Sequence, residues 1–268
     1  MKNQLFVFVF SGFLLMASGC AFKVDKDTEI RKNKNEALLL ATLYHQQAAE
    51  RDALSYQAFN LAKKMLMEDS KRMGLSKKPA VVVDIDETIL DNSPYEAELI
   101  LENIDYPARW DEWIHSASAE PLKGAVEFLT YAQEEGYDVF YITNRREKFR
   151  QPTLENLQKH GFPSAESAHL LMRTDESSKK ERRENVSRTH RIVLLMGDNL
   201  SDFSAVFDEQ PGSRRSALVD SLKNEFGFRY IVLPNTMYGA WLDAIYAYDY
   251  DLTEEQKLEV LYEHLRGF

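Results

Sequence analysis

The sequence predicts an α/β fold, a doubly wound parallel sheet with a smaller, mostly helical cap. Two observations carry this prediction. From about residue 79 onward, apolar segments of strand length alternate with helical segments, which is the pattern of a parallel sheet with crossover helices. The first of these segments, "AVVV" at 80–83, is a continuous apolar run, as expected for a strand covered on both faces. The cap is expected from N-terminal helices and from an insert at 91–123.

Residues 1–19 have the features of a lipoprotein signal peptide. Lys2 supplies positive charge, the apolar run "LFVFVFSGFLLM" follows, and small residues precede Cys20. The run is shorter than the roughly 20 residues that span a membrane. The segment before Cys20 resembles the bacterial lipobox, although Ala17 stands where that pattern usually has leucine. An ordinary signal peptide with an incidental cysteine is the alternative.

The lipobox resemblance implies that Cys20 is acylated and anchors the protein to a membrane of the bacterial cell envelope. Ala21 after the cysteine is compatible with outer-membrane sorting. More than one acyl chain is needed for stable anchoring. Because Cys20 is the only cysteine, the chain forms no intramolecular disulfide.

Residues 20–35 are charged and poor in apolar side chains, which predicts a tether. From residue 36, apolar residues recur at helical spacing, so one or two long helices are expected within 36–78, ending near Gly74. His45 lies alone in this stretch, and we expect a surface or core residue rather than a metal ligand.

Residues 79–268 contain the alternating elements, and together with the N-terminal helices they form the single predicted domain, 36–268. Strands are expected at 80–86, 137–145, 168–173, 191–199 and 228–235. Helices are expected at 125–136, 153–162 and 177–188, with more after the last strand.

Ligands of such sheets bind beyond the carboxyl ends of the strands. The polar residues expected at these ends are Asp84 and Asp86, then Thr143, Asn144 and Arg145, then Asp198 and Asp202, with Lys179 and Lys180 preceding the fourth strand. Carboxylates packed together repel one another, so the arrangement requires a cation, and oxygen ligands favour Mg²⁺. A single aspartate such as Asp202 can be a helix cap, but the shared position argues against that reading for all of them.

These residues carry a family resemblance. "DIDET", "ITNR", the lysine of "SSKK" and "GDNLSDF" resemble the four motifs of the haloacid dehalogenase superfamily. Within it the chain is similar to class C acid phosphatases, which are bacterial lipoprotein phosphatases. The similarity covers most of the mature chain, since "PNTMYGAW" and the tryptophan-rich insert also look like that family.

The resemblance implies Mg²⁺-dependent hydrolysis of phosphomonoesters. Asp84 would attack phosphorus to form an aspartyl-phosphate, and Asp86 would act as general acid and base, which fits a mildly acidic optimum. Thr143 and Asn144 would contact the substrate, and Lys179 would neutralise the phosphoryl group; its "S-x-K" spacing favours it over Lys180. One Mg²⁺ per chain would be held by Asp84, Asp198 and the backbone carbonyl of Asp86, with Asp202 acting through water or orienting the lysine.

Aromatic residues of the insert suggest the substrate. Tyr106 and Trp110 are candidate stacking partners for a flat leaving group, and Tyr238 would close the pocket. The family's broad specificity implies 5′-nucleotides and nicotinamide mononucleotide as substrates. The alternative is that these aromatics pack the cap, and for Trp113 we prefer it.

Two other functions share the sequence features. A phosphotransferase or phosphomutase would use the same aspartyl-phosphate, and a surface-binding lipoprotein or adhesin would need no chemistry. The net charge of −10 argues weakly against a nucleic-acid partner, and the mixed-charge segment 179–192 predicts a solvated helix face. The expected partners are therefore small phosphomonoesters and the membrane, which the protein would contact through its N-terminal lipid. A homodimer is a further alternative.

Overall fold

The computed structural model describes residues 35–71 and 77–268, which belong to one compact unit, Asn33–Phe268. The predicted signal peptide, Cys20 and the tether up to residue 34 lie outside the described residues. Within the described ranges, no helix combines the length and the apolar character that crossing a membrane would require.

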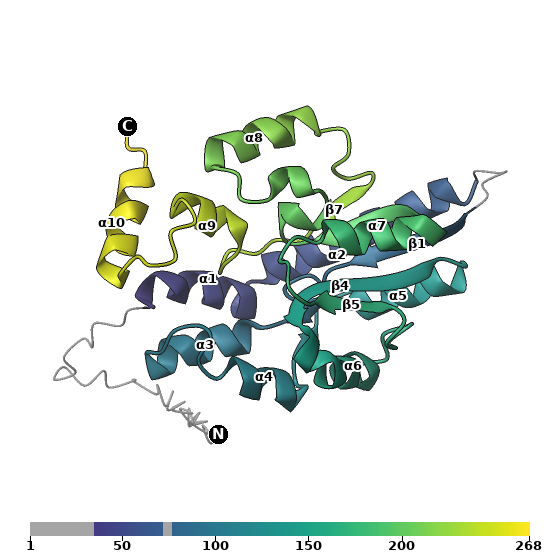
Figure 1. The fold of residues 1–268 in the computed structure, drawn as a ribbon, viewed down its shortest axis with the longest axis horizontal. Helices are drawn as coiled ribbons and strands as arrows, with labels where there is room; N and C mark the ends of the chain where they lie inside the picture. Colours follow the sequence, from purple (N-terminus) through teal and green to yellow (C-terminus); the bar gives the residue numbers. More distant parts are fainter. Residues whose placement is uncertain (1–34, 72–76) are drawn as a thin grey trace, which may run out of the picture. The chain divides into compact units, whose positions relative to one another are not determined.

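A five-stranded parallel sheet forms the centre of the unit, in the order β5-β4-β1-β6-β7 (Figure 1). The strands are β1 (Lys78–Val83), β4 (Asp138–Arg146), β5 (Leu170–Arg173), β6 (His190–Gly197) and β7 (Tyr230–Val232). The chain winds outward from β1 through β4 to β5, then returns to the other side of β1 and continues through β6 to β7. This confirms the predicted doubly wound sheet, and each strand overlaps its predicted segment.

Both faces of the sheet are covered, which explains the continuous apolar run in β1. Alternate residues of a strand point to opposite faces. Val81 and Val83 belong to the larger core cluster, whereas Ala80 and Val82 belong to the smaller one. The first face carries α2 (Ala49–Asp69), α5 (Ala125–Glu134) and α6 (Arg150–Lys159), and the second carries α7 (Lys180–Thr189).

The N-terminal helices have different positions. Helix α1 (Glu36–Gln47) packs against α3 (Ser93–Glu102) of the insert, as the predicted cap requires. Helix α2 instead packs against α5, and its Phe59, Ala62 and Leu66 are part of the larger core cluster. The insert therefore packs mainly against α1, and Arg51 of α2 reaches its start, with Nη2 3.3 Å from Asp91 Oδ2. Helix α2 ends at Asp69, before the expected Gly74.

The insert is mostly helical. It contains α3 and α4 (Trp110–Ser116), and its ends are joined by a two-stranded antiparallel sheet of β2 (Leu90–Asp91) and β3 (Glu120–Pro121). These strands are too short to produce an alternating pattern in the sequence, and they were not predicted. By pairing, they return the chain from the insert to the start of α5.

The remaining elements are short. They are η1 (Glu147–Phe149), η2 (Leu200–Asp202), η3 (Ala205–Phe207), α8 (Gly212–Ser221), α9 (Ala240–Ile245) and α10 (Glu254–His264). Helices after β7 were expected, but α8 was not. Its one buried side chain is Arg215, so the helix has no apolar stripe that the sequence could reveal.

Candidate active site

A large cleft, about 1170 Å³ in volume, opens beyond the carboxyl ends of β1, β4 and β6. In a sheet with this strand order the crevice forms where the winding direction changes, beside β1. The predicted site residues that line it are Asp84, Asp86, Tyr106, Trp110, Asn144, Lys179, Asp198, Asp202 and Tyr238. Thr143 is fully buried just beneath it. Residues far apart in the sequence are thus brought together at one edge of the sheet.

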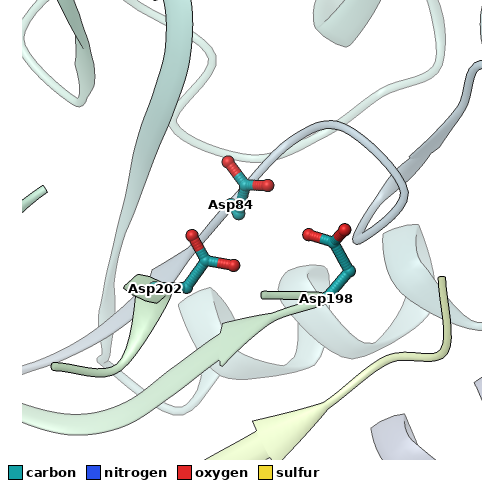
Figure 2. A group of neighbouring side chains, drawn as sticks. All are labelled: Asp84, Asp198 and Asp202. Carbon is teal, nitrogen blue, oxygen red and sulfur yellow. The ribbon is translucent and has the colours of Figure 1, made fainter. Parts of the chain in front are cut away.

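Three carboxylates lie close together at this edge (Figure 2). Asp84 follows β1, while Asp198 and Asp202 follow the neighbouring strand β6, and one oxygen from each lies within 4.8 Å of the others. The alternation in the extended chain after β1 explains part of this geometry. Ile85 is fully buried in the core, so the carboxylates on either side of it are directed toward the cleft.

Lys179 supplies positive charge to this acidic cluster. Its Nζ contacts Asp84 Oδ1 and lies 2.6 Å from Asp202 Oδ1. Burial opposes the charge of Lys179, but the carboxylates of Asp202 and Asp84 outweigh it and hold the pKa of the ammonium above its usual value. Lys180, the alternative, is exposed and pairs with Glu184 at 3.9 Å. The structure therefore places Lys179 in the site.

One lysine does not neutralise three carboxylates. Burial raises the pKa of Asp84 to about 7; Lys179 opposes this shift, and the charges of Asp202 and Asp86 add to it. Burial, followed by repulsion from Asp202 and Asp84, raises the pKa of Asp198 well above its ordinary range. A divalent cation would relieve this repulsion, and a set of carboxylate oxygens fits a hard metal ion. The acidic cluster is thus a suitable metal site.

Asp198 and Asp202 are fixed by neighbouring groups. Asn235 donates to Asp198 Oδ2 at 2.8 Å, and the Asn199 backbone N–H donates to Asp202 Oδ2 at 2.9 Å. Asp202 therefore also caps the short helix η2, as the alternative reading allowed. Gly197 makes this turn possible, because a Cβ at this position would lie 2.2 Å from Asp202 Oδ2.

Asp86 has a different environment from that of Asp84. Its carboxylate accepts a bidentate interaction from Arg145, with Nη2–Oδ1 at 2.8 Å and Nε–Oδ2 at 3.2 Å, and a hydrogen bond from Asn92 at 2.8 Å. Burial opposes ionisation of Asp86, but Arg145 and Asn92 outweigh it and lower the pKa of the carboxyl. The pKa values of the two aspartates of the first motif are thus shifted in opposite directions.

Arg145 and Asn92 are site residues whose roles were not predicted. Arg145 was recognised at the strand end, but its partner was not. Asn92 is the N-cap of α3, yet its side chain makes no capping hydrogen bond. It donates instead to Asp86 and Glu87, and its Oδ1 accepts from Trp113 Nε1 at 2.8 Å. Trp113 thus has the structural role that we preferred for it, as a support beneath Asp86.

Thr143 and Asn144 are held by two arginines. The Thr143 hydroxyl accepts from the Arg145 backbone N–H at 3.1 Å and lies 3.4 Å from Asp86 Oδ2. Arg182 donates to the Thr143 carbonyl at 2.6 Å and to Asn144 Oδ1 at 2.7 Å. With Asn144 Oδ1 engaged, its amide N–H groups remain the natural donors toward the cleft.

The aromatic residues lie on two sides of the cleft. Tyr106 is 66% exposed, and its ring meets Trp110 edge to face at 6.0 Å between centroids. Trp110 also contacts Tyr95 and packs against the core, so it lines the cleft and packs the insert at the same time. Tyr238 follows β7, an edge strand of the sheet, whereas Tyr106 and Trp110 belong to the insert that follows the central strand β1. Its backbone N–H and that of Met237 are directed at Asn235 Oδ1.

His45 is a buried core residue, as expected. It is 4% exposed, and its Nε2 accepts the Thr236 backbone N–H at 3.1 Å. Burial, with a smaller contribution from Arg51, lowers the pKa of His45 to about 4, so the ring is neutral and can accept this bond. The hydrogen bond between His45 and Thr236 joins α1 to the loop that carries Asn235 and Tyr238.

Comparisons with known proteins agree with this geometry. A family model described as HAD superfamily, subfamily IIIB (acid phosphatase) matches residues 23–241. The class C acid phosphatase from Bacillus anthracis superposes with a TM-score of 0.85 at 40% identity, over 88% of this chain and 99% of that one. The same enzyme with tungstate bound gives 0.84 at 41% identity, over 87% and 98%.

A plant relative extends the similarity. Acid phosphatase 1 from Solanum lycopersicum is 29% identical over 198 residues, which is 70% of this chain and 68% of the relative. The family match spans well over half of the chain, and the relatives share one enzymatic activity. Together they confirm the predicted resemblance and the phosphatase activity. The chain belongs to the acid phosphatases of the haloacid dehalogenase superfamily, subfamily IIIB.

Proposed function

We propose that this acid phosphatase hydrolyses phosphomonoesters with Mg²⁺ through an aspartyl-phosphate on Asp84. The observation that carries this proposal is the setting of Asp84, whose buried carboxylate contacts Lys179 and faces the cleft beside Asp198 and Asp202. A nucleophile needs a free oxygen on the substrate side, and a cation beside it lowers the repulsion between two anions.

The first step joins an Asp84 oxygen to phosphorus and breaks the bond between phosphorus and the ester oxygen. Lys179 remains charged and neutralises negative charge on the phosphoryl group. The departing alkoxide needs a proton, and Asp86 is the carboxyl two residues along the same segment, facing the same cleft. In the second step water attacks phosphorus, Asp86 accepts its proton, and the Asp84 carboxylate is regenerated.

Asp86 must carry a proton to act as an acid, although Arg145 favours its ionised form. A bound phosphate brings negative charge next to Asp86, and negative charge nearby raises the pKa of a carboxyl. Arg145 would therefore position Asp86, and the bound substrate would promote protonation of the Asp86 carboxyl. A mildly acidic optimum is consistent with this balance.

Asp84, Asp198 and the backbone carbonyl of Asp86 are the groups that would hold Mg²⁺, with Asp202 acting through water or through Lys179. The metal would supply positive charge for the equatorial phosphoryl oxygens. Asn235 and Thr88 lie 2.8 and 3.5 Å from the Asp198 carboxylate oxygens and would orient it.

The substrate preference that we propose is for aromatic or nucleoside monophosphates, including 5′-nucleotides and nicotinamide mononucleotide. Tyr106, Trp110 and Tyr238 supply ring faces and edges around the same cleft that contains Asp84. The tungstate-bound relative supports the phosphoryl end of the proposal, since tungstate is a tetrahedral oxyanion like phosphate.

We also propose that the mature protein is lipid-anchored at Cys20 in the bacterial outer membrane. The sequence motif supports this proposal; Cys20 itself lies outside the described residues. A tethered phosphatase at that surface would act on small phosphomonoesters outside the inner membrane.

The test combines a substrate panel with the nucleophile variant Asp84→Asn. We expect release of phosphate from 4-nitrophenyl phosphate and 5′-nucleotides by the wild type, its loss in EDTA and its return with Mg²⁺. Asp84→Asn should have essentially no turnover, because an amide does not attack phosphorus. The control is Asp220→Asn, which changes an exposed aspartate of α8 that does not line the cleft and should retain activity.

Acid quenching during turnover, followed by mass spectrometry of peptides, should locate a phosphate on Asp84. Substantial activity of pure Asp84→Asn would refute the covalent mechanism. Transfer of the phosphoryl group to added alcohols without release of free phosphate would favour a phosphotransferase. Absence of turnover on every substrate with Mg²⁺ would favour the surface-binding alternative.

A further inference from the structure

Helix α3 places an unpaired carboxyl in the wall of the cleft. Glu96 is only 8% exposed, and it lines the cleft together with Tyr106 and Trp110. Among the described residues, nothing forms a hydrogen bond or an ion pair with its side chain. A buried polar group without a partner is costly, so such a group in a binding cleft is a candidate ligand contact.

A second acidic residue of the insert provides a contrast. Asp111 lines the same cleft, but it is exposed and paired with Lys148 at 2.6 Å. Burial alone raises the pKa of Glu96 to about 7, with no neighbouring cation to oppose the shift. Its environment lacks the donor that a carboxylate requires, and a bound ligand is in a position to provide one.

The neighbours of Glu96 place it on the leaving-group side of the cleft. Burial is the main cause that raises the pKa of Tyr95. Negative charge on Glu96 and on Tyr106 raises it further, so both groups lie near that ring. Tyr106 in turn is close enough to Asp86 to sense its charge. Glu96 thus lies beside the aromatic rings of the insert, and one of these rings is within electrostatic reach of Asp86.

We propose that Glu96 is a specificity residue that binds a nitrogen donor, an amine or amide N–H, on the leaving group of the substrate. The aromatic rings would hold the flat part of the leaving group, and Glu96 would accept the N–H at its far end. With Glu96 ionised, above its pKa of about 7, a charged hydrogen bond in this desolvated site is stronger than a neutral one, and a leaving group with a carboxylate there would be repelled. This inference rests on the proposed hydrolysis and defines the chemistry of the group that is released.

The experiment uses four aryl phosphates that differ only in the para substituent: methyl, carbamoyl, aminomethyl and carboxyl. We expect the wild type to favour the aminomethyl and carbamoyl substrates over the methyl one by about 10- to 150-fold in kcat/KM. The carboxyl substrate should be the poorest. Because each rate is divided by the rate on the methyl substrate, a general loss of activity cancels.

The variants separate charge from hydrogen bonding. Glu96→Leu should abolish the preference for both nitrogen donors, whereas Glu96→Gln should lose the aminomethyl preference and keep much of the carbamoyl one. Glu102→Gln is the matched control, since Glu102 is exposed at the end of the same helix and should leave the ratios unchanged.

The wild-type ratios stand as a measurement even if a variant folds poorly. Equal rates of the wild type on the methyl, carbamoyl and aminomethyl substrates would overturn the inference, as would a preference that persists in both Glu96 variants. Failure of the proposed hydrolysis is a different result, because all four substrates would then release no phosphate.

Discussion

Gly197→Ala should damage the acidic cluster without altering any charged group. The new Cβ would lie 2.2 Å from Asp202 Oδ2 and 2.5 Å from Asp202 Cβ. Ordinary contact begins at 3.4 Å, so the first separation is short by 3.4 − 2.2 = 1.2 Å. Rotation of the carboxylate alone does not remove the second clash. The turn between β6 and η2 must therefore move.

The cost follows from what the turn holds. Asp202 is fixed by the Asn199 N–H at 2.9 Å and by Lys179 at 2.6 Å, and both interactions would lengthen. Overpacking of this kind costs about 1–3 kcal/mol, which for a unit of this size corresponds to a decrease of about 2–12 °C in Tm. A displacement of about 1 Å in an active site can lower kcat/KM about 100-fold.

The assay measures Tm by calorimetry and kcat/KM on 4-nitrophenyl phosphate with Mg²⁺. Gly212→Ala is the matched control, since a Cβ at Gly212 has no atom within 4 Å. We expect the control to match the wild type in both measurements. If Gly197→Ala also matches the wild type in both, the close approach of Asp202 to Gly197 does not constrain the site, and the reasoning fails.

Three further predictions follow from the site and the sequence. Tyr238→Ala should raise KM for a 5′-nucleotide and lower kcat/KM roughly 5- to 150-fold, with little change on a small aliphatic phosphate; equal losses on both, with a lower Tm, would assign Tyr238 to packing. Mg²⁺ should raise the Tm of the wild type, because a metal bound as proposed at the acidic cluster stabilises only the folded state. In Asp198→Asn the increase in Tm with Mg²⁺ should be much smaller. An increase equal to that of the wild type would mean that the metal binds at another site. Cys20→Ser should release or misprocess the protein, and normal membrane retention of that variant would contradict lipid attachment.

The catalytic end of the site was predictable because its residues follow the strands directly. Once β1, β4 and β6 are recognised as parallel strands, their carboxyl ends must meet at one edge of the sheet. That rule places Asp84 and Asp198 together without any knowledge of side-chain conformation. The choice between Lys179 and Lys180 required the structure, because successive residues at the start of a helix point in different directions.

The roles of the supporting residues Asn92 and Glu96 were not predictable, because both stand at the start of a helix, where residues of these types are common for other reasons. Asn92 precedes a helix and is a typical N-cap, yet its side chain binds Asp86 and Glu87. Glu96 stands in the first turn of α3, where an acidic residue is ordinary on helix-dipole grounds. Only the three-dimensional structure shows that its carboxyl is buried in the cleft wall without a partner.

The two ends of the cleft are built in different ways, and this difference determines what each variant should change. Asp84, Asp198 and Lys179 are fixed by strand ends, a tight turn and buried ion pairs, so their replacement should lower kcat on every substrate. Tyr106 and Glu96 belong to the insert, which packs against the core cluster through other residues such as Ile114 and Trp113. Changes at those two positions should therefore alter the ratios between substrates. A substitution at either position that lowered all rates by the same factor would show that the insert also shapes the catalytic end.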